Sequence, residues 1–307
     1  MNTIEETRAR LEKFLAASGI SQNTAAAESG LSAALISNFL KGKYTGDNEK
    51  TAETLKSWIE AAEERLQGEN NGVFYSGLKN TELIKKVVRF AHIKCEMALV
   101  YGDSGAGKTT ALKKYAEENA GVIYISMNSA AHSVAAILKQ IASELGRSGA
   151  GSSSELMNRL IEFLRGTKRL IIIDEADHLT LQALQAVRNL NDEAGTGIVL
   201  AGNYKLFTQL YLGTRGAKDY EFDQLRSRLY YKQQIRNDYT LTEISRIFPK
   251  ADKASAAILK KVADSESLRA ASKLYSITIN ASERLGEAFS ARILKTTAVQ
   301  FSGGEIK

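Results

Sequence analysis

The chain has few of the residues that cross-link or interrupt a fold. Its 307 residues include one cysteine, one proline and three histidines. A single cysteine excludes an intrachain disulfide, and no histidine or cysteine spacing is typical of a zinc site. We therefore expect a protein of a reducing compartment. The lone proline, Pro249, favours a largely helical chain with few rigid turns.

Long apolar runs are also missing. No segment approaches about 18 consecutive apolar residues, the length at which a membrane-spanning helix is expected. The first residues, MNTIEETRARLEKFLAAS, are amphipathic and charged and contain no apolar signal region. We expect a cytoplasmic protein with no membrane partner. The formal net charge of +6 would suit a polyanionic partner, although many proteins without one carry a similar excess.

The clearest motif that is present lies in the segment MALVYGDSGAGKTT, residues 97–110. An apolar run leads into a glycine-rich loop and then a helical pattern, which is the strand, loop and helix context of a P-loop. The backbone N–H groups of such a loop bind phosphate oxygens, its lysine reaches the β and γ phosphates, and the next hydroxyl ligates Mg²⁺. The sequence therefore predicts a site for ATP or GTP with Mg²⁺. The predicted nucleotide-binding residues are Gly102, Asp103, Ser104, Gly105, Ala106, Gly107, Lys108, Thr109 and Thr110.

Two acids follow a second apolar run, Leu170–Ile173. Such a run is typical of a parallel strand buried on both faces, and ligands of an open α/β sheet lie at the carboxyl ends of its strands. Asp174 is therefore predicted to hold Mg²⁺, and Glu175 to polarise the attacking water as a general base. The alternative is that the two acids cap the next helix. Asp177 and His178 are predicted to be local caps or surface groups.

A third apolar run, Gly197–Ala201, ends in Gly202 and Asn203. An asparagine at the tip of a strand beside the nucleotide can hold the lytic water or contact the γ phosphate. The alternative is an ordinary turn residue in the left-handed conformation. Helices and strands alternate from Thr81 to about Gln234, which predicts a doubly wound parallel sheet.

The N-terminal region has the pattern of a helix-turn-helix. Helices are expected over Thr3–Ala17, Gln22–Ser29, Ala33–Leu40 and Asn48–Leu66, with Ser21 and Ser32 as N-caps. A short turn with glycine lets two helices cross steeply, so that the second can enter the major groove of DNA. The candidate DNA contacts are Ser32, Ala33, Ser37, Asn38, Lys41 and Lys43. The alternative is a small helical module that binds protein.

The chain is predicted to contain four parts. The segment QGENNGVFYSG is rich in glycine and asparagine and is typical of a linker. The tail after Asp238 has an almost wholly helical pattern. The predicted parts are a helix-turn-helix DNA-binding domain at 1–66, the linker at 67–77, a P-loop core at 78–236 and a helical C-terminal domain at 237–307.

These motifs, in this order, resemble those of the AAA+ ATPases. GDSGAGKT and IIIDEAD match that family's Walker A and Walker B motifs, Asn203 matches its sensor 1, and FDQLRSRLYYK contains the pair Arg226 and Arg228 at the arginine-finger position. The tail resembles the family's helical lid, with Arg269 where a sensor 2 arginine would lie. The resemblance implies an α/β P-loop core, a helical lid and an ATPase activity. Arg228 is the preferred finger that acts on the neighbouring subunit. Arg226 lies about 200° away around a helix and would face elsewhere, so only one of the two is expected to reach across. The alternatives are that each is an exposed or ion-paired arginine, and that Arg269 is a surface residue of the lid.

The whole combination resembles more narrowly the B proteins of Mu-type transposing phages. That resemblance implies an ATPase stimulated by DNA and by assembly, and a location in the cytoplasm of a bacterial host. It further implies non-specific binding to double-stranded DNA, an ATP-dependent helical filament as the homo-oligomer, and delivery of target DNA to a transposase. The loops 146–154 and 211–218 are candidates for DNA contacts within a filament. The alternatives are a helicase loader or replication initiator, a small-molecule kinase and a ligand-responsive transcription factor.

Overall fold

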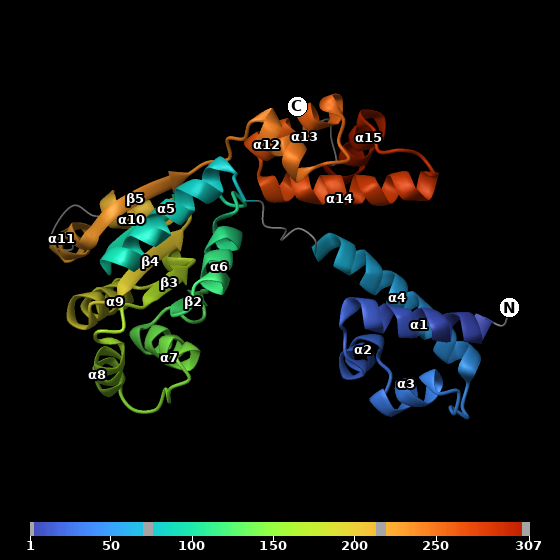
Figure 1. Ribbon diagram of the computed structural model, residues 1–307, viewed down its shortest axis with the longest axis horizontal. Helices are drawn as coiled ribbons and strands as arrows, with labels where there is room; N and C mark the ends of the chain where they lie inside the picture. Colours follow the sequence, from blue (N-terminus) through green and yellow to red (C-terminus); the bar gives the residue numbers. More distant parts are fainter. Residues whose placement is uncertain (1–2, 70–75, 213–218, 303–307) are drawn as a thin grey trace. The chain divides into compact units, whose positions relative to one another are not determined.

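The computed structural model describes residues 3–69, 76–212 and 219–302. The chain divides into two compact units, residues 1–71 and 72–307 (Figure 1). The division falls within the segment predicted as a linker, residues 67–77. None of the helices in the described ranges combines the length and the hydropathy that a membrane span needs.

The first unit is built of helices alone. They are α1 (Thr3–Ser18), α2 (Gln22–Ser29), α3 (Ala33–Leu40) and α4 (Asn48–Glu69). The bounds of α2 and α3 are those predicted. The fourth helix is longer than predicted and continues through the first residues of the expected linker, whose residues 70–75 lie outside the described part of the chain.

Local hydrogen bonds explain where α2 and α3 begin. The Ser21 hydroxyl accepts from the backbone N–H of Thr24 at 3.1 Å, and the Ser32 hydroxyl accepts from that of Leu35 at 3.1 Å. Each bond satisfies one of the N–H groups that a helix leaves unpaired at its start. Gly30, at φ 72°, ends α2 in the left-handed conformation that glycine adopts readily.

Apolar side chains from all four helices form the core of this unit. The Trp58 ring packs edge-on against Phe14 with 5.6 Å between ring centroids, and its Nε1 donates to Glu28 at 3.1 Å. The buried indole is therefore both packed and hydrogen-bonded. The fully buried aliphatic and aromatic residues around it include Leu11, Ile36, Phe39, Leu55 and Ile59.

The second unit contains a five-stranded parallel sheet with the strand order β2-β3-β4-β1-β5. The strands are β1 (Met97–Gly102), β2 (Val122–Ser126), β3 (Leu170–Asp174), β4 (Gly197–Gly202) and β5 (Leu229–Ile235). The strands β1, β3 and β4 lie where the apolar runs were predicted, and β2 falls within the predicted alternation of helices and strands. The edge strand β5, which pairs with β1, was not among the predicted strands.

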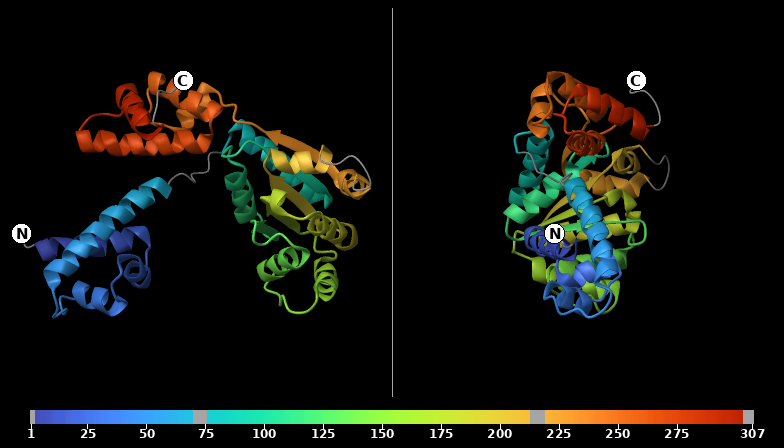
Figure 2. Two further views of the ribbon diagram at one scale, coloured as in Figure 1. Left: turned by 180° about the vertical axis from the view of Figure 1, so that it is seen from behind. Right: turned by 90° about the vertical axis from the view of Figure 1, so that its right-hand side faces the viewer.

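Helices cover both faces of the sheet (Figures 1 and 2). They are α5 (Lys79–Lys94), α6 (Lys108–Glu118), α7 (Val134–Glu144), α8 (Ser153–Leu164), α9 (Leu181–Ala194), α10 (Tyr204–Tyr211) and α11 (Asp219–Arg228). Alternate residues of β3 enter the two cores: Ile171 and Ile173 pack with α7 to α11, and Leu170 and Ile172 pack with α5 and α6. The predicted fold class, a P-loop α/β core, is confirmed.

The tail forms a small helical domain with its own core, as predicted. It contains α12 (Leu241–Ile247), α13 (Lys253–Ser265), α14 (Leu268–Leu285) and α15 (Ala291–Ser302). Thr240 and Glu243 form a reciprocal capping box at the start of α12, and Ser267 caps α14. Residues that pack inside this domain include Ile244, Leu259, Ala271 and Leu294.

Candidate nucleotide-binding site

The P-loop joins β1 to α6 by a turn that requires glycine. Gly102 has φ 137°, and a Cβ atom there would lie 1.9 Å from the carbonyl oxygen of Ile235 on β5. The backbone N–H of Asp103 donates to that same oxygen at 2.9 Å. A side chain at Gly102 would therefore push the loop away from the neighbouring strand.

Lys108, the predicted phosphate-binding lysine, lies inside this loop at the start of α6. Its Nζ donates to the carbonyl oxygens of Gly102 at 2.9 Å and Asp103 at 2.7 Å, and the residue is 9% exposed. Burial lowers the pKa of its ammonium group, whereas the charge of Asp174 acts in the opposite direction. The ammonium group therefore lies inside the loop that is predicted to bind phosphate.

Asp174 is buried at the end of β3, directly beside the first turn of α6. Its Oδ2 accepts from the Thr109 hydroxyl at 2.7 Å, and its Oδ1 accepts from the backbone N–H of Glu175 at 2.9 Å. A hydroxyl and a carboxylate are oxygen ligands of the kind that Mg²⁺ takes, with waters and phosphate oxygens supplying the rest. The pair Thr109 and Asp174 therefore fits the predicted metal position. In the described ranges, no group of three or more His, Cys, Asp or Glu side chains is gathered as a separate metal site.

Tyr124 is a residue of this site that was not predicted. Its hydroxyl donates to Asp174 Oδ2 at 2.9 Å, the same oxygen that accepts from Thr109. Burial, and then the charge of Asp174, raises the pKa of Tyr124, so that the phenol keeps the proton it donates. The sequence signal was weak, because Tyr124 reads as one more member of the apolar strand β2.

We expect Tyr124→Phe to lower the free energy of unfolding by about 1.5–3 kcal/mol, since the buried carboxylate loses one of its donors. Urea unfolding measures this. The matched control is Tyr115→Phe, which removes a hydroxyl that lies 3.1 Å from Nδ1 of His92, a ring whose pKa is lowered by burial. The control should cost about 1 kcal/mol. Equal losses in the two variants would contradict a special role for the Asp174 contact.

Glu175 lies in a conformation that is unusual for a residue with a side chain. Its φ and ψ are 54° and 35°, and unlike the buried Asp174 it is exposed. Residues other than glycine are strained in the left-handed backbone conformation, and such residues are found often at functional sites. The alternative that the two acids cap the following helix is wrong, because Thr180 caps α9 by accepting from the N–H of Ala183 at 3.2 Å.

Asn203 comes directly after β4, which lies between β3 and β1, and so at the same edge of the sheet. Its backbone is extended, with φ −81° and ψ −176°, so the alternative of a left-handed turn residue is wrong.

Asp177 contacts Asn203: the carboxylate accepts from Asn203 Nδ2 at 2.9 Å. Asp177 is 5% exposed, so the prediction that it is a local cap or surface group is wrong. His178 is half-buried in the same 3-10 turn, η2 (Ala176–His178).

The two candidate finger arginines occupy the last turn of α11. Arg228 donates from Nε to Asp192 at 2.7 Å, and its side chain is 42% exposed. The Arg226 side chain is 19% exposed, and it donates to the carbonyl oxygen of Leu210 at 3.1 Å. Arg228 is therefore the more accessible of the pair, and both arginines form ion pairs within the chain, Arg228 with Asp192 and Arg226 with Asp223. The role of a finger stays a prediction.

The helical lid rests on the P-loop through Asn237 and α14. The backbone N–H of Asn237 donates to Asp103 Oδ2 at 2.8 Å, and its Nδ2 lies 3.3 Å from Ser104 O and 3.2 Å from Glu266 O. A Cβ on Gly105 would lie 2.7 Å from the Cβ of Ser267. The start of α14 thus touches the P-loop.

This contact brings Arg269, the predicted sensor 2 residue, to the nucleotide site. A Cβ on Gly105 would lie 3.3 Å from that of Arg269, and the charge of Arg269 is among the causes that lower the pKa of Lys108, after burial. Of the remaining P-loop residues, Ala106 is buried, and Gly107 and Thr110 are half-buried around the start of α6.

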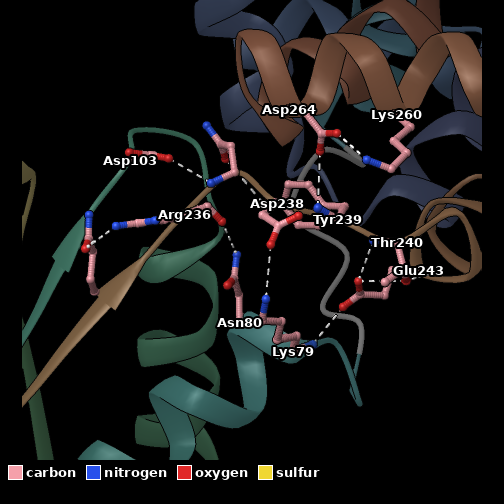
Figure 3. Close-up of polar contacts among 12 residues, drawn as sticks. Lys79, Asn80, Asp103, Arg236, Asp238, Tyr239, Thr240, Glu243, Lys260 and Asp264 are labelled. Atoms are coloured by element: carbon pink, nitrogen blue, oxygen red, sulfur yellow. Dashed lines mark hydrogen bonds and ion pairs between the residues drawn. The ribbon is translucent and has the colours of Figure 1, made fainter.

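Further hydrogen bonds fasten the lid to the beginning of α5 (Figure 3). The backbone N–H of Lys79 donates to Glu243 Oε1 at 2.8 Å, and Lys79 Nζ donates to Asp238 Oδ2 at 3.1 Å. Glu243 also accepts from Thr240 in the capping box, so one carboxylate joins α5 and α12. Two separate segments of the core, the P-loop and the start of α5, therefore hold the lid.

The candidate DNA contacts surround α3 of the first unit. Asn38 is exposed on that helix, and Ser32 is exposed as its N-cap. Ala33 and Ser37 are half-buried, while Lys41 and Lys43 are exposed just beyond the helix. Residues 1–66 carry eight lysines and arginines against ten acids, so the positive excess of the chain lies in the rest of the sequence. Of the two loops considered for DNA contacts, residues 213–218 lie outside the described part of the chain.

A P-loop, a buried aspartate bonded to the threonine of that loop, and a helical lid at one edge of a parallel sheet define a P-loop ATPase of the AAA class. Residues 92–210 match the family model of an AAA domain. The ATP-dependent target DNA activator B of Escherichia phage D108 is 34% identical over 239 residues, which cover 76% of this chain and 73% of that protein. The Mu-like prophage FluMu DNA transposition protein B of Haemophilus influenzae is 34% identical over 228 residues, or 74% and 79% of the two chains. The chain belongs to this family of Mu-like B transposition proteins, which confirms the resemblance predicted from its motifs.

Two further comparisons complete this result. The ATP-dependent target DNA activator B of Escherichia phage Mu is 33% identical over 239 residues, which cover 76% of this chain and 73% of that protein. Among solved structures, a variant of RuvB from Thermotoga maritima is similar at a TM-score of 0.44, with 16% identity over 71% of this chain and 66% of that chain.

Proposed function

We propose that this ATPase binds double-stranded DNA without sequence preference when ATP is bound, forms filaments on it and delivers it as target DNA to a transposase. The observation that carries the proposal is a P-loop site of the geometry described, in a chain that is 34% identical over 239 residues to an ATP-dependent target DNA activator. The printed names of the relatives refer to ATP, target DNA and transposition. A helicase loader, which shares the ATPase class, would have a helicase as its partner.

The site's own residues support a hydrolytic mechanism. Lys108 would bind the β and γ phosphates together with the loop N–H groups, while Thr109 and Asp174 would hold Mg²⁺. Bound there, Mg²⁺ would supply charge that neutralises the phosphate oxygens. Glu175, exposed at the end of β3, would accept a proton from water, and Asn203 would orient that water or the γ phosphate.

Assembly would complete the site. Arg228 is a half-exposed cation on α11, and we propose that it acts on ATP bound by the neighbouring subunit. A head-to-tail contact of this kind is heterologous, and where its rotation does not close it builds a helical filament. Hydrolysis would then depend on assembly, because an isolated subunit lacks the cation that stabilises the transition state.

Electron microscopy of the protein with duplex DNA tests the proposal directly. We expect ordered filaments with ATP and none with ADP, and an ATP turnover that rises when duplex is added. The sequence of the duplex should matter little, and binding should weaken steeply with salt, because backbone phosphates dominate such contacts. Filaments that form equally with ADP, or turnover that is indifferent to duplex, would contradict the proposal.

We expect Arg228→Ala to bind ATP normally and to lose at least about 10³-fold of the DNA-stimulated turnover, the range found for trans-acting arginines. The matched control is Arg188→Ala, since Arg188 donates to the same Asp192 at 3.1 Å and its loss breaks the same local network. ATP binding by calorimetry and phosphate release with and without duplex are the measurements. Normal stimulated turnover in Arg228→Ala would remove the trans finger, and equal losses in both variants would assign the effect to Asp192.

A further inference from the structure

The buried carboxylate of Asp177 belongs to no role described so far. It lies in the turn η2 that follows Glu175, and it reaches across to the end of the neighbouring strand β4. Its Oδ2 accepts from the side-chain Nδ2 of Asn203 at 2.9 Å, and its Oδ1 is 3.3 Å from the backbone N of Asn203. A single carboxylate therefore binds both the backbone and the side chain of one residue.

The other end of the Asn203 amide is also bound. Its Oδ1 accepts from the backbone N–H of Lys205 at 2.7 Å, as the N-cap of α10. Turning the amide over would place its oxygen against the Asp177 carboxylate and its N–H₂ group against the Lys205 N–H. Both exchanged contacts would be repulsive, so the orientation of the amide is determined by its two partners.

This orientation decides what Asn203 can offer to a ligand. An amide nitrogen carries two N–H bonds, and the bond to Asp177 uses one of them. Asn203 is exposed at the same sheet edge as the P-loop and Asp174, so its second N–H can reach a ligand bound there. A donor there suits a γ phosphate oxygen or the oxygen of the attacking water, whereas an amide turned over would present a carbonyl oxygen.

We propose that Asp177 is a positioning residue for ATP hydrolysis, which fixes the Asn203 amide with a donor toward the nucleotide. The inference rests on the proposed hydrolytic function of this site. The close approach has a steric basis as well, because a Cβ at Gly202 would lie 2.7 Å from Asp177 Oδ1. Glycine at this position lets the carboxylate lie against the end of β4.

A competing role is electrostatic. The negative charge of Asp177 is among those that act on Lys108, after burial and the charges of Asp174 and Asp103. A residue that acted through Lys108 would change the binding of ATP, whether or not Asn203 is present. A residue that acts through Asn203 would change the chemical step, and only while Asn203 is present.

A double-mutant cycle separates these roles. Asp177→Asn, Asn203→Ala and the double variant are compared with the wild-type protein for kcat and KM of ATP, with saturating duplex. We expect Asp177→Asn to lower kcat by about 10–100-fold, the usual effect of removing a residue that orients another, with KM changed by less than about 2-fold. In the Asn203→Ala background, Asp177→Asn should change kcat by less than about 2-fold.

A reciprocal exchange, Asp177→Asn with Asn203→Asp, controls for folding. The pair keeps one donor facing one acceptor, and a carboxylate at 203 still accepts from Lys205, but no side-chain N–H remains at that position. We expect a thermal unfolding midpoint close to that of the wild-type protein, with turnover as low as that of Asn203→Ala.

Three outcomes would overturn the proposal. The first is a raised KM in Asp177→Asn, and the second is an equal loss of kcat on adding Asp177→Asn to the wild-type protein and to Asn203→Ala. The third is an exchanged pair whose thermal unfolding midpoint is as low as that of Asp177→Asn alone. Failure of the proposed function is distinguishable from these. In that case the wild-type protein itself would hydrolyse no ATP, or Lys108→Ala would be as active as the wild type.

Discussion

Replacing Lys108 with alanine is expected to abolish ATP-dependent behaviour: nucleotide binding should become undetectable at micromolar protein, and turnover should fall at least about 100-fold. The ammonium group lies inside the loop, with both donated hydrogen bonds going to loop carbonyl oxygens. Because the site also contains Asp174 and Asp103, removing the cation leaves negative charge facing a polyphosphate. Calorimetric titration with ATP and ADP, and a phosphate-release assay, are the measurements.

Two comparisons make this result specific to the charge. Lys108→Met keeps most of the buried volume without the ammonium group, and it should fail in the same way while unfolding at a similar temperature. Lys114→Ala removes a lysine from the same helix whose Nζ pairs with Glu117 at 3.5 Å on the surface, and it should bind ATP normally. ATP binding by Lys108→Met at wild-type affinity would show that the loop holds phosphate without its lysine.

Features that depend on residues adjacent in the sequence could be predicted with bounds accurate to within about a residue. A serine cap and the first turn it satisfies lie within three residues, so Ser21 and Ser32 located α2 and α3 with their observed bounds. The P-loop is likewise one continuous segment, and the strand before it and the helix after it were found together. The uninterrupted apolar runs located β3 and β4, because strands buried on both faces need no alternation.

Contacts between distant segments could not be predicted, and they complete the site. Tyr124 and Asp174 are 50 residues apart, and Asp103 and Asn237 are 134 apart. Neither pairing leaves a local pattern, since a tyrosine in a strand and an asparagine after one are common. Asp177 was misjudged for the same reason, because its partner Asn203 is 26 residues away.

The edge strand β5 was missed for a different reason. It follows α11 without an intervening turn, and it has a neighbour on one side, β1. Its sequence, LYYKQQI, is buried at its two ends and largely exposed or half-buried between them. An edge strand with polar residues lacks the apolar run that identified the central strands, and polar edges also protect a sheet from pairing with other chains.

The second large effect is expected from Glu175→Gln, which should bind Mg²⁺ and ATP with wild-type affinity but lower turnover by about 10²–10⁴-fold, the usual contribution of a general base. Glutamine keeps the size of the side chain and cannot take up the proton. Glu175 is exposed, and the buried carboxylate bonded to Thr109 belongs to Asp174, so the metal position should be unaffected. Asp174→Asn is the contrasting variant, and it should lose the Mg²⁺-dependent part of ATP binding.

Filament lifetime on duplex DNA gives this variant a second readout. If hydrolysis loosens the filament, Glu175→Gln filaments formed with ATP should persist in electron micrographs long after wild-type filaments have disassembled. Filaments that disassemble at the wild-type rate, or turnover within about 10-fold of wild type, would show that Glu175 is not the base.

The backbone of Glu175 allows function to be separated from stability at this same position. At φ 54° a side chain costs about 1–3 kcal/mol, whereas glycine adopts this conformation freely. Glu175→Gly should therefore be inactive, and yet its free energy of unfolding should equal or exceed that of the wild-type protein. This comparison allows about 1 kcal/mol for the greater entropy of glycine in the unfolded chain. Urea unfolding beside the turnover assay makes the comparison. A variant that is both inactive and clearly less stable would mean that the glutamate side chain supports the fold, and that the strained conformation is not kept for catalysis.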